Sequence, residues 1–197
     1  TRMSDGRTHI QNHYRGAVEE YTDQYRQTYR GYPANLKRLE MLLRRMSALG
    51  VRTLLDCGCG EGTPMQRIAA ASGTQVWGFD FVPDMVARAR EMLQAHRLPP
   101  RVWQGNITDA AAFRPAGMET PPAYDAVIAM GVFPHLDPRA EACALSHMAS
   151  VTRPGGRVFV EFRNALFALF TLNRYTYEFF CDELIQVREL QARYPQW

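Results

Sequence analysis

The spacing of apolar positions changes along the chain. In the first segment, apolar and aromatic residues recur at steps of three and four, at Tyr14, Val18, Tyr21, Tyr25 and Tyr29. This is one face of an amphipathic helix. The stretch "ANLKRLEMLLRRMSAL" (34–49) has helical spacing too, and Gly50 stands where a left-handed glycine ends a helix. We therefore predict an N-terminal helical cap over residues 1–50.

From residue 51 onward, short apolar runs alternate with helical stretches. The predicted strands are "VRTLLDC", "TQVWGFD", "RVWQG", "YDAVIAM" and "GRVFVEF". The predicted helices begin near Pro64, with Thr63 as N-cap, at Pro83, and at Pro138 after Asp137. Strands separated by helices indicate an α/β fold: a Rossmann-like doubly wound sheet, mostly parallel, with helices on both faces.

The length of 197 residues suits one domain, 1–197, in three parts. These are the cap (1–50), a ligand-binding core (51–163) and a helical segment (164–197). Within the last part, 164–180 is dense in Phe, Leu and Tyr, and Asn164 suits a helix N-cap. The segment has too many apolar residues for one narrow stripe, so it predicts a lid over a substrate, an interface with a partner or second subunit, or plain core packing.

Composition narrows the class of protein. No apolar run approaches the roughly 20 residues of a membrane helix, and "TRMSDGRTHIQNHYRG" lacks the apolar core of a signal peptide. A soluble, cytoplasmic protein without membrane contact is expected. Cys57, Cys59, Cys143 and Cys181 have neither zinc-site nor disulfide-framework spacing, which indicates reduced thiols and no metal.

Charge is weakly informative. The net charge is only +3, although residues 1–50 hold nine Lys and Arg against five Asp and Glu. A small excess of this kind is typical of a solvated face, while an anionic ligand beneath it is the alternative. Nucleic-acid binding does not follow from charge alone.

The stretch "LLDCGCGEGTP" (54–64) places three glycines in five positions between a strand and a helix. Glycine lets a ligand lie against peptide groups, and this turn lies where doubly wound sheets bind nucleotides. A purely structural turn is the alternative. The nicotinamide fingerprint Gly-x-Gly-x-x-Gly fails, because Thr63 stands in place of its third glycine. The carboxylate of Asp56 would also repel a pyrophosphate.

The heptapeptide Asp56–Gly62 resembles the "Asp-x-Gly-Cys-Gly-x-Gly" motif of class I S-adenosylmethionine-dependent methyltransferases. The resemblance covers about 51–163 and continues in the right order, with Asp80 ending the second strand, then "QGNITD", "YDAVIAMGVFPHL" and "RPGGRVFVEF". It implies S-adenosylmethionine as cofactor. After the fifth strand the chain is short for the family's further helix and two strands, so this part is either truncated or specialised.

The resemblance also implies roles for residues of the first two motifs. The backbone of Gly58, Cys59 and Gly60 would pass close to the cofactor's methionine and ribose, with Asp56 toward its amino-acid end. Asp80 would accept hydrogen bonds from both ribose hydroxyls.

Further roles follow for residues later in the chain and before the core. Phe81 would pack on the adenine, and Asn106, where the family often has Asp, would accept from the adenine amino group beside Ile107. Met130 would lie near the methionine part through its backbone. Tyr21 would close over the cofactor carboxylate, unless it belongs to the core stripe.

The sequence gives little information about the molecule that accepts the methyl group. His135 is the candidate general base, with a structural role as the alternative. We expect a small-molecule methyltransferase acting on oxygen or nitrogen, for example in secondary-metabolite or sugar modification. An RNA or protein methyltransferase and a catalytically inactive cofactor-binding module are the alternatives, and a homodimer is compatible with each.

Overall fold

The computed structural model describes residues 34–115, 117–119 and 123–162, together with Tyr25, Thr176, Tyr177, Phe180, Cys181, Ala192 and Arg193. The chain divides into two compact units, Thr1–Glu161 and Phe162–Trp197. The fold below belongs to the first unit. The single-domain organisation stays a prediction, and most of the apolar segment 164–180 lies outside the described residues.

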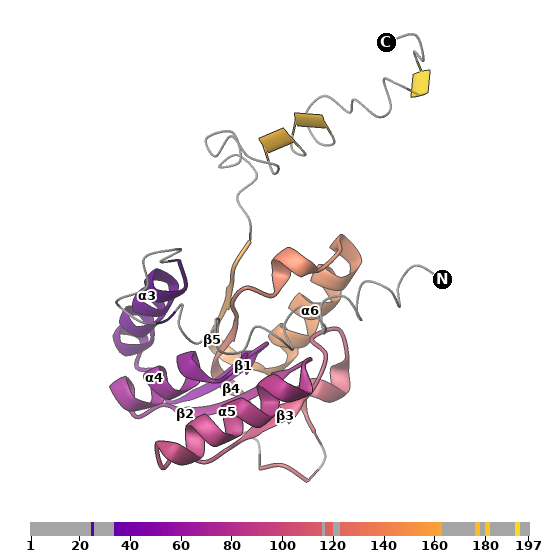
Figure 1. Ribbon diagram of the computed structural model, residues 1–197. Coiled ribbons are helices and arrows are strands. Elements are labelled where there is room, and N and C mark those ends of the chain that lie inside the picture. The colour runs from indigo at the N-terminus through magenta and orange to yellow at the C-terminus, as the bar shows by residue number, and fades with distance from the viewer. Residues whose placement is uncertain are drawn as a thin grey trace. The chain divides into compact units, whose positions relative to one another are not determined.

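The described part of the first unit contains one five-stranded sheet of order β3-β2-β1-β4-β5, and every neighbouring pair of strands is parallel (Figure 1). The strands are β1 (Thr53–Cys57), β2 (Gln75–Asp80), β3 (Val102–Gln104), β4 (Tyr124–Ala129) and β5 (Thr152–Val160). The α-helices are α3 (Ala34–Leu49), α4 (Thr63–Ser72), α5 (Pro83–Ala95) and α6 (Pro138–Val151), and η1 (Ala110–Phe113) and η2 (Phe133–His135) are 3₁₀-helices. The predicted doubly wound, Rossmann-like fold is confirmed.

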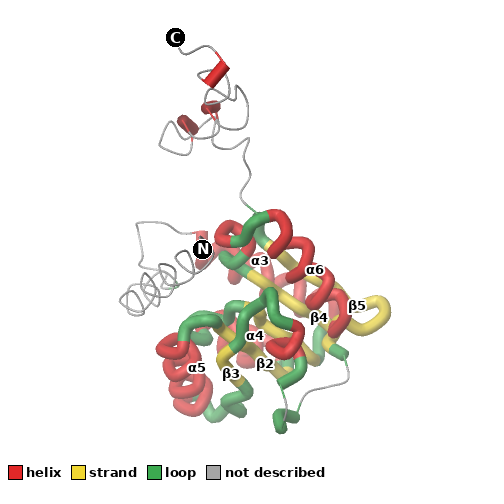
Figure 2. The backbone as a smooth tube through the Cα atoms, turned by 90° about the vertical axis from the view of Figure 1, so that its right-hand side faces the viewer, coloured by secondary structure: helices red, strands yellow, loops and turns green. Residues whose placement is uncertain are grey.

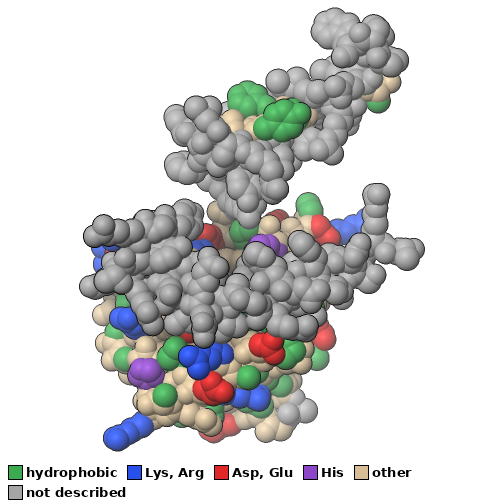
Figure 3. All heavy atoms as spheres, viewed as in Figure 1, with side chains coloured by type: hydrophobic (Ala, Val, Ile, Leu, Met, Phe, Trp, Pro, Cys, Tyr) green, Lys and Arg blue, Asp and Glu red, His purple; other side chains and the backbone are tan. Residues whose placement is uncertain are grey.

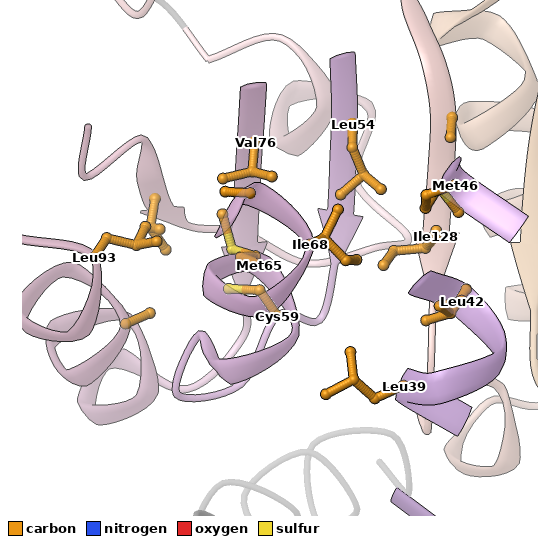
Figure 4. Packing of buried hydrophobic residues seen from close by; sticks show 14 of the residues in the cluster. Leu39, Leu42, Met46, Leu54, Cys59, Met65, Ile68, Val76, Leu93 and Ile128 are labelled. Carbon is orange, nitrogen blue, oxygen red and sulfur yellow. The ribbon is translucent and has the colours of Figure 1, made fainter. Parts of the chain in front are cut away.

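Alternate residues of each strand pack on opposite faces of the sheet, as the twofold period of a strand requires. Leu54 of β1 joins a cluster with α3, α4 and α5, while its neighbour Leu55 joins a cluster with η1, η2 and α6. Figure 4 shows the first cluster, in which Leu42 of α3 and Ile68 of α4 lie near Ile128 of β4. Figure 2 shows the helices around the sheet from the side. Burial on both faces explains why β1, β2 and β4 read as continuous apolar runs, whereas β5 is largely exposed.

The helix ends follow local sequence signals, with one correction. Gly50 has φ +60°, and the amides of Gly50 and Val51 donate to the carbonyls of Ser47 and Met46, which is the Schellman ending expected for α3. Asp137 caps α6 by accepting from the amide of Ala140.

The prediction of Thr63 as the N-cap of α4 is wrong. Gly62 takes that position with φ 91°, and Thr63 is the first helical residue. The left-handed turn needs glycine at the cap, and the hydroxyl of Thr63 donates to Glu61 instead.

Asp125 ties together strands at the amino end of the sheet. Its Oδ2 accepts from the amides of Arg52 (2.7 Å) and Thr53 (3.0 Å), and Arg153 donates from Nε to Oδ1 at 2.6 Å. Arg153 lies where the register of β5 against β4 shifts between Tyr124 and Ala126. These hydrogen bonds hold the pKa of Asp125 below its usual value, although burial acts in the opposite direction.

Of the predicted aromatic stripe, only Tyr25 is described. It is 8% exposed and belongs to the same core cluster as α3. Within the described residues, no helix has the length and apolar character needed to cross a membrane.

Candidate functional site

The glycine turn between β1 and α4 is built on positive backbone angles. Gly58, Gly60 and Gly62 have φ of 90°, 55° and 91°. The amides of Gly58 and Cys59 donate to the carbonyl of Phe79 at 2.8 and 3.0 Å, which ties the turn to the end of β2. Because the strands are parallel, the turn lies at the carboxyl edge of the sheet, where doubly wound folds bind ligands.

Asp80 stands against this turn. Its Oδ2 accepts from the amide of Gly60 at 2.8 Å, and its Oδ1 accepts from the amide of Val82 at 2.9 Å. An ionised carboxylate offers about four lone-pair sites, so capacity for a further donor remains beside the amides of Gly60, Phe81 and Val82. Burial raises the pKa of Asp80, while these backbone hydrogen bonds oppose the rise. Asp80, which is predicted to bind the ribose, therefore also links the glycine turn to the start of α5.

Asp56, at the end of β1, is 2% exposed. Burial and, to a smaller extent, the charge of Asp80 raise its pKa to about 8. A buried carboxylate next to another carboxylate is costly to ionise without a cation. Asp56 and Asp80 thus lie near the carboxyl ends of adjacent parallel strands, and a cationic group beside Asp56 would favour its ionised form.

Glu61, between Gly60 and Gly62, is a buried acid that the sequence analysis missed. Its two oxygens accept from the hydroxyl of Thr63 at 2.8 Å and from the amide of Thr63 at 3.3 Å. It is 0% exposed, and burial raises its pKa. The sequence signal for this role was an acidic residue placed between two glycines and two positions before Thr63. Its contacts lie within the turn, so it shapes the turn rather than facing a ligand.

The predicted adenine residues lie on the neighbouring loops. Asn106 follows β3, and its Oδ1 accepts from the amide and the hydroxyl of Thr108 at 3.0 and 2.9 Å. Its predicted acceptor oxygen is therefore already engaged in a local turn. Ile107 is buried, at 6% exposed, and Phe81 is partly buried directly after Asp80. Their adenine contacts stay predictions.

The loop after β4 holds two more predicted residues. Met130 is partly buried and packs against the core cluster of α3, α4 and α5. His135 is exposed at the end of η2, and its amide donates to the carbonyl of Val132 at 3.0 Å. Val132 itself contacts the glycine turn, since a Cβ built on Gly58 would come within 2.4 Å of Val132 Cγ2. Tyr21 lies outside the described residues.

The cysteines of the turn have unreactive, protonated thiols. Cys57 and Cys59 are buried free thiols, and burial raises the pKa of each well above its usual value. Thiols held in the neutral form are poor nucleophiles and poor metal ligands. Among the described residues, no group of three His, Cys, Asp or Glu side chains is arranged to hold a metal ion.

The fold and this edge of buried acids and left-handed glycines define a nucleoside-binding α/β domain. A family model described as a methyltransferase domain matches residues 54–156, which include every described site residue above. The chain therefore belongs to this family of methyltransferase domains. The predicted membership of the class I methyltransferases that use S-adenosylmethionine is confirmed.

Curated relatives agree. The chain is 35% identical to a tRNA U34 carboxymethyltransferase of Idiomarina loihiensis over 116 residues, which are 57% of this chain and 33% of that protein. It is 33% identical to a ubiquinone biosynthesis O-methyltransferase of Xylella fastidiosa over 141 residues, 70% of this chain and 52% of that protein. The chain thus spans between a third and about half of the length of these relatives.

Among solved structures, magnesium protoporphyrin IX methyltransferase from Synechocystis PCC 6803, crystallised with bound SAM, superimposes with a TM-score of 0.65. The match covers 83% of this chain and 79% of that chain at 18% identity. At this identity the likeness establishes the fold.

Proposed function

We propose that this chain binds S-adenosylmethionine at the glycine turn and transfers its methyl group to oxygen or nitrogen of a small-molecule acceptor. The observation that carries the proposal is the pairing of Asp56 with Asp80 at the carboxyl edge of β1 and β2, on a turn of left-handed glycines. The cofactor has a sulfonium, an amino group and two ribose hydroxyls. Two acids at this edge match a ligand that brings both positive charge and hydroxyl donors.

The residues present fit this cofactor. Gly58, Gly60 and Gly62 have positive φ and carry no side chain, so their peptide groups can lie directly against a ligand at this edge of the sheet. The carboxylate of Asp80 accepts hydrogen bonds from the amides of Gly60 and Val82 and keeps acceptor capacity for a ribose hydroxyl. Asp56, protonated near neutral pH in the free protein because its pKa is about 8, would ionise in contact with a cation.

When bound, the cofactor supplies a methyl group already activated by its positive sulfur. The chain's own contribution is then to hold the cofactor and to keep the acceptor in line with it. Positioning of this kind lowers reaction barriers by on the order of 7–11 kcal/mol in well-oriented systems. His135, exposed at the end of η2 on the ligand side of β4, is our candidate to remove a proton from a hydroxyl or amine acceptor.

A small molecule is the favoured acceptor because the Xylella relative, which aligns with 70% of this chain, is named as an O-methyltransferase of ubiquinone biosynthesis. RNA is the second candidate, on the strength of the tRNA-modifying relative. On the face shown in Figure 3, Lys and Arg side chains stand among Asp and Glu rather than in a continuous basic stripe. A cytoplasmic location, and the role of 164–180 as lid or dimer interface, belong to the same proposal.

A methyl-transfer screen with radiolabelled S-adenosylmethionine tests the proposal against its alternatives. The protein is incubated with separate pools of metabolites, RNA and protein, and His135→Ala is run beside the wild type. We expect label in the metabolite pool and reduced transfer by the variant. Label in RNA or protein alone would favour the second candidate, and binding without transfer to any pool would indicate an inactive module.

A further inference from the structure

Glu161, the residue after β5, joins three separate parts of the fold through one carboxylate oxygen. Its Oε2 accepts from the amide of Gly131 at 2.9 Å and from a guanidinium nitrogen of Arg38. Its own amide donates to the carbonyl of Ala129 at 3.3 Å, which extends the pairing of β4 with β5. α3, the end of β5 and the loop after β4 are thus linked at one point.

The link is partly shielded from water. The side chain of Arg38 is 20% exposed and that of Glu161 is 30% exposed. By contrast, a second ion pair on α3, Lys37 with Glu40, has side chains that are 68% and 42% exposed. Hydrogen bonds to charged groups matter more where water is excluded, and exposed pairs contribute little. The same helix therefore carries one partly buried link to the loop after β4 and one more solvent-exposed pair.

The link reaches the glycine turn in one further step. Gly131 has φ 75°, and the next residue, Val132, packs against Gly58 closely enough to leave no room for a Cβ there. The direction of the chain at Gly131 decides where Val132 lies. An amide held by a carboxylate fixes that direction, since the loop has no strand pairing of its own after Ala129.

We propose that Glu161, held by Arg38, is a positioning residue for the segment Met130–His135 and so sets how firmly the cofactor's amino-acid end is bound. The inference rests on the proposed function, because it takes the glycine turn as the cofactor site. Glu161 acts through Gly131 and Val132 and does not touch the cofactor. The side of α3 facing the sheet thereby influences ligand binding.

The test compares Glu161→Ala with Glu161→Gln, Arg38→Ala and the matched control Glu40→Ala. Affinity is measured by calorimetry for S-adenosylmethionine and for 5′-methylthioadenosine, which keeps the adenosine but lacks the amino-acid part. Glu161→Ala should weaken the first ligand about tenfold and the second less than about twofold. Glu161→Gln keeps an acceptor for Gly131 and should restore most of the affinity, and Glu40→Ala should change neither.

Amide hydrogen exchange over residues 129–136 gives a readout that needs no ligand. Glu161→Ala should accelerate exchange in this segment, Arg38→Ala should do so less, and the double variant should match Glu161→Ala because both changes break one link. Unchanged exchange, or equal loss of both ligands, would overturn the inference. If the wild type bound no S-adenosylmethionine, the proposed function would fail, whereas the exchange data would still decide whether Glu161 orders the loop.

Discussion

Two buried aspartates at opposite ends of the sheet have opposite electrostatics. Asp125, at the amino end, is satisfied by two backbone amides and Arg153, and its pKa is lowered. Asp56, at the carboxyl end, has Asp80 as its charged neighbour, and its pKa is raised to about 8. The first has the surroundings of a structural carboxylate, complete without a ligand. The second is kept in its neutral form near pH 7 chiefly by burial, and a strongly raised pKa of this kind is typical of functional sites.

Asp80→Ala should give the largest effect on ligand binding. Losing acceptors for ribose hydroxyls costs roughly 1.5–3 kcal/mol, so affinity for S-adenosylmethionine should fall more than tenfold. The melting temperature should fall as well, because the amides of Gly60 and Val82 lose their partner. Calorimetry and thermal unfolding measure the two effects. Unchanged affinity with a lower melting temperature would make Asp80 a structural cap and nothing more.

Asp125→Ala should show the reverse pattern. It leaves the amides of Arg52 and Thr53 and the guanidinium of Arg153 without their acceptor, which should lower the free energy of unfolding by about 1–3 kcal/mol. Urea unfolding gives this value. Affinity for S-adenosylmethionine, measured well below the unfolding midpoint, should be unchanged, and a matching loss of affinity would remove the contrast between the two ends of the sheet.

Gly58→Ala and Gly73→Ala separate backbone strain from site geometry. Both glycines have positive φ, 90° and 66°, so each substitution should cost about 1–2 kcal/mol of stability. Nothing lies within 4 Å of a Cβ at Gly73, whereas one at Gly58 meets Val132. Gly58→Ala should therefore also weaken cofactor binding, by calorimetry. Equal affinities in the two variants would show that the turn does not contact the ligand.

A further effect is expected on the pH dependence of stability. Because the folded pKa of Asp56 is about 8 and its ordinary value is 3.8, its contribution is full below about pH 4 and is lost as pH rises toward 8. The pKa of Asp125 is lowered, so its contribution to stability is full above its ordinary pKa of 3.8 and is lost as the pH falls below that value. Urea unfolding of the free protein at pH 6 and 8 should show a decline that Asp56→Asn reduces. An identical decline in the variant would contradict the raised pKa.

The sequence predicted most of the fold because the relevant signals were local. Apolar runs marked the strands, of which β1, β2 and β4 are buried on both faces, and Asp137 and Gly50 marked helix ends. Thr63 was misplaced by one residue, since threonine is a usual N-cap and a left-handed Gly62 is indistinguishable in sequence from the other glycines of the turn.

Only the parts of the candidate site that belong to sequence motifs were predictable. The motifs predicted Asp56 and Asp80 near the ends of the first two strands, and these strands, β1 and β2, are parallel neighbours in the sheet. The link from Arg38 through Glu161 to Gly131 was not predictable, because it joins residues 123 positions apart in the chain and depends on tertiary contacts. The spacing of residues along the sequence also did not show that the side-chain oxygen of Asn106 accepts hydrogen bonds from Thr108.

The most direct test of the central claim is calorimetric titration with S-adenosylmethionine at pH 7 in buffers of different ionisation enthalpy, for the wild type and Asp56→Asn. We predict that the wild type binds this ligand, does not bind a nicotinamide dinucleotide, and releases a proton that the variant does not release, because contact with a cation ionises Asp56. Binding of the dinucleotide alone, or the same proton release from both proteins, would contradict it.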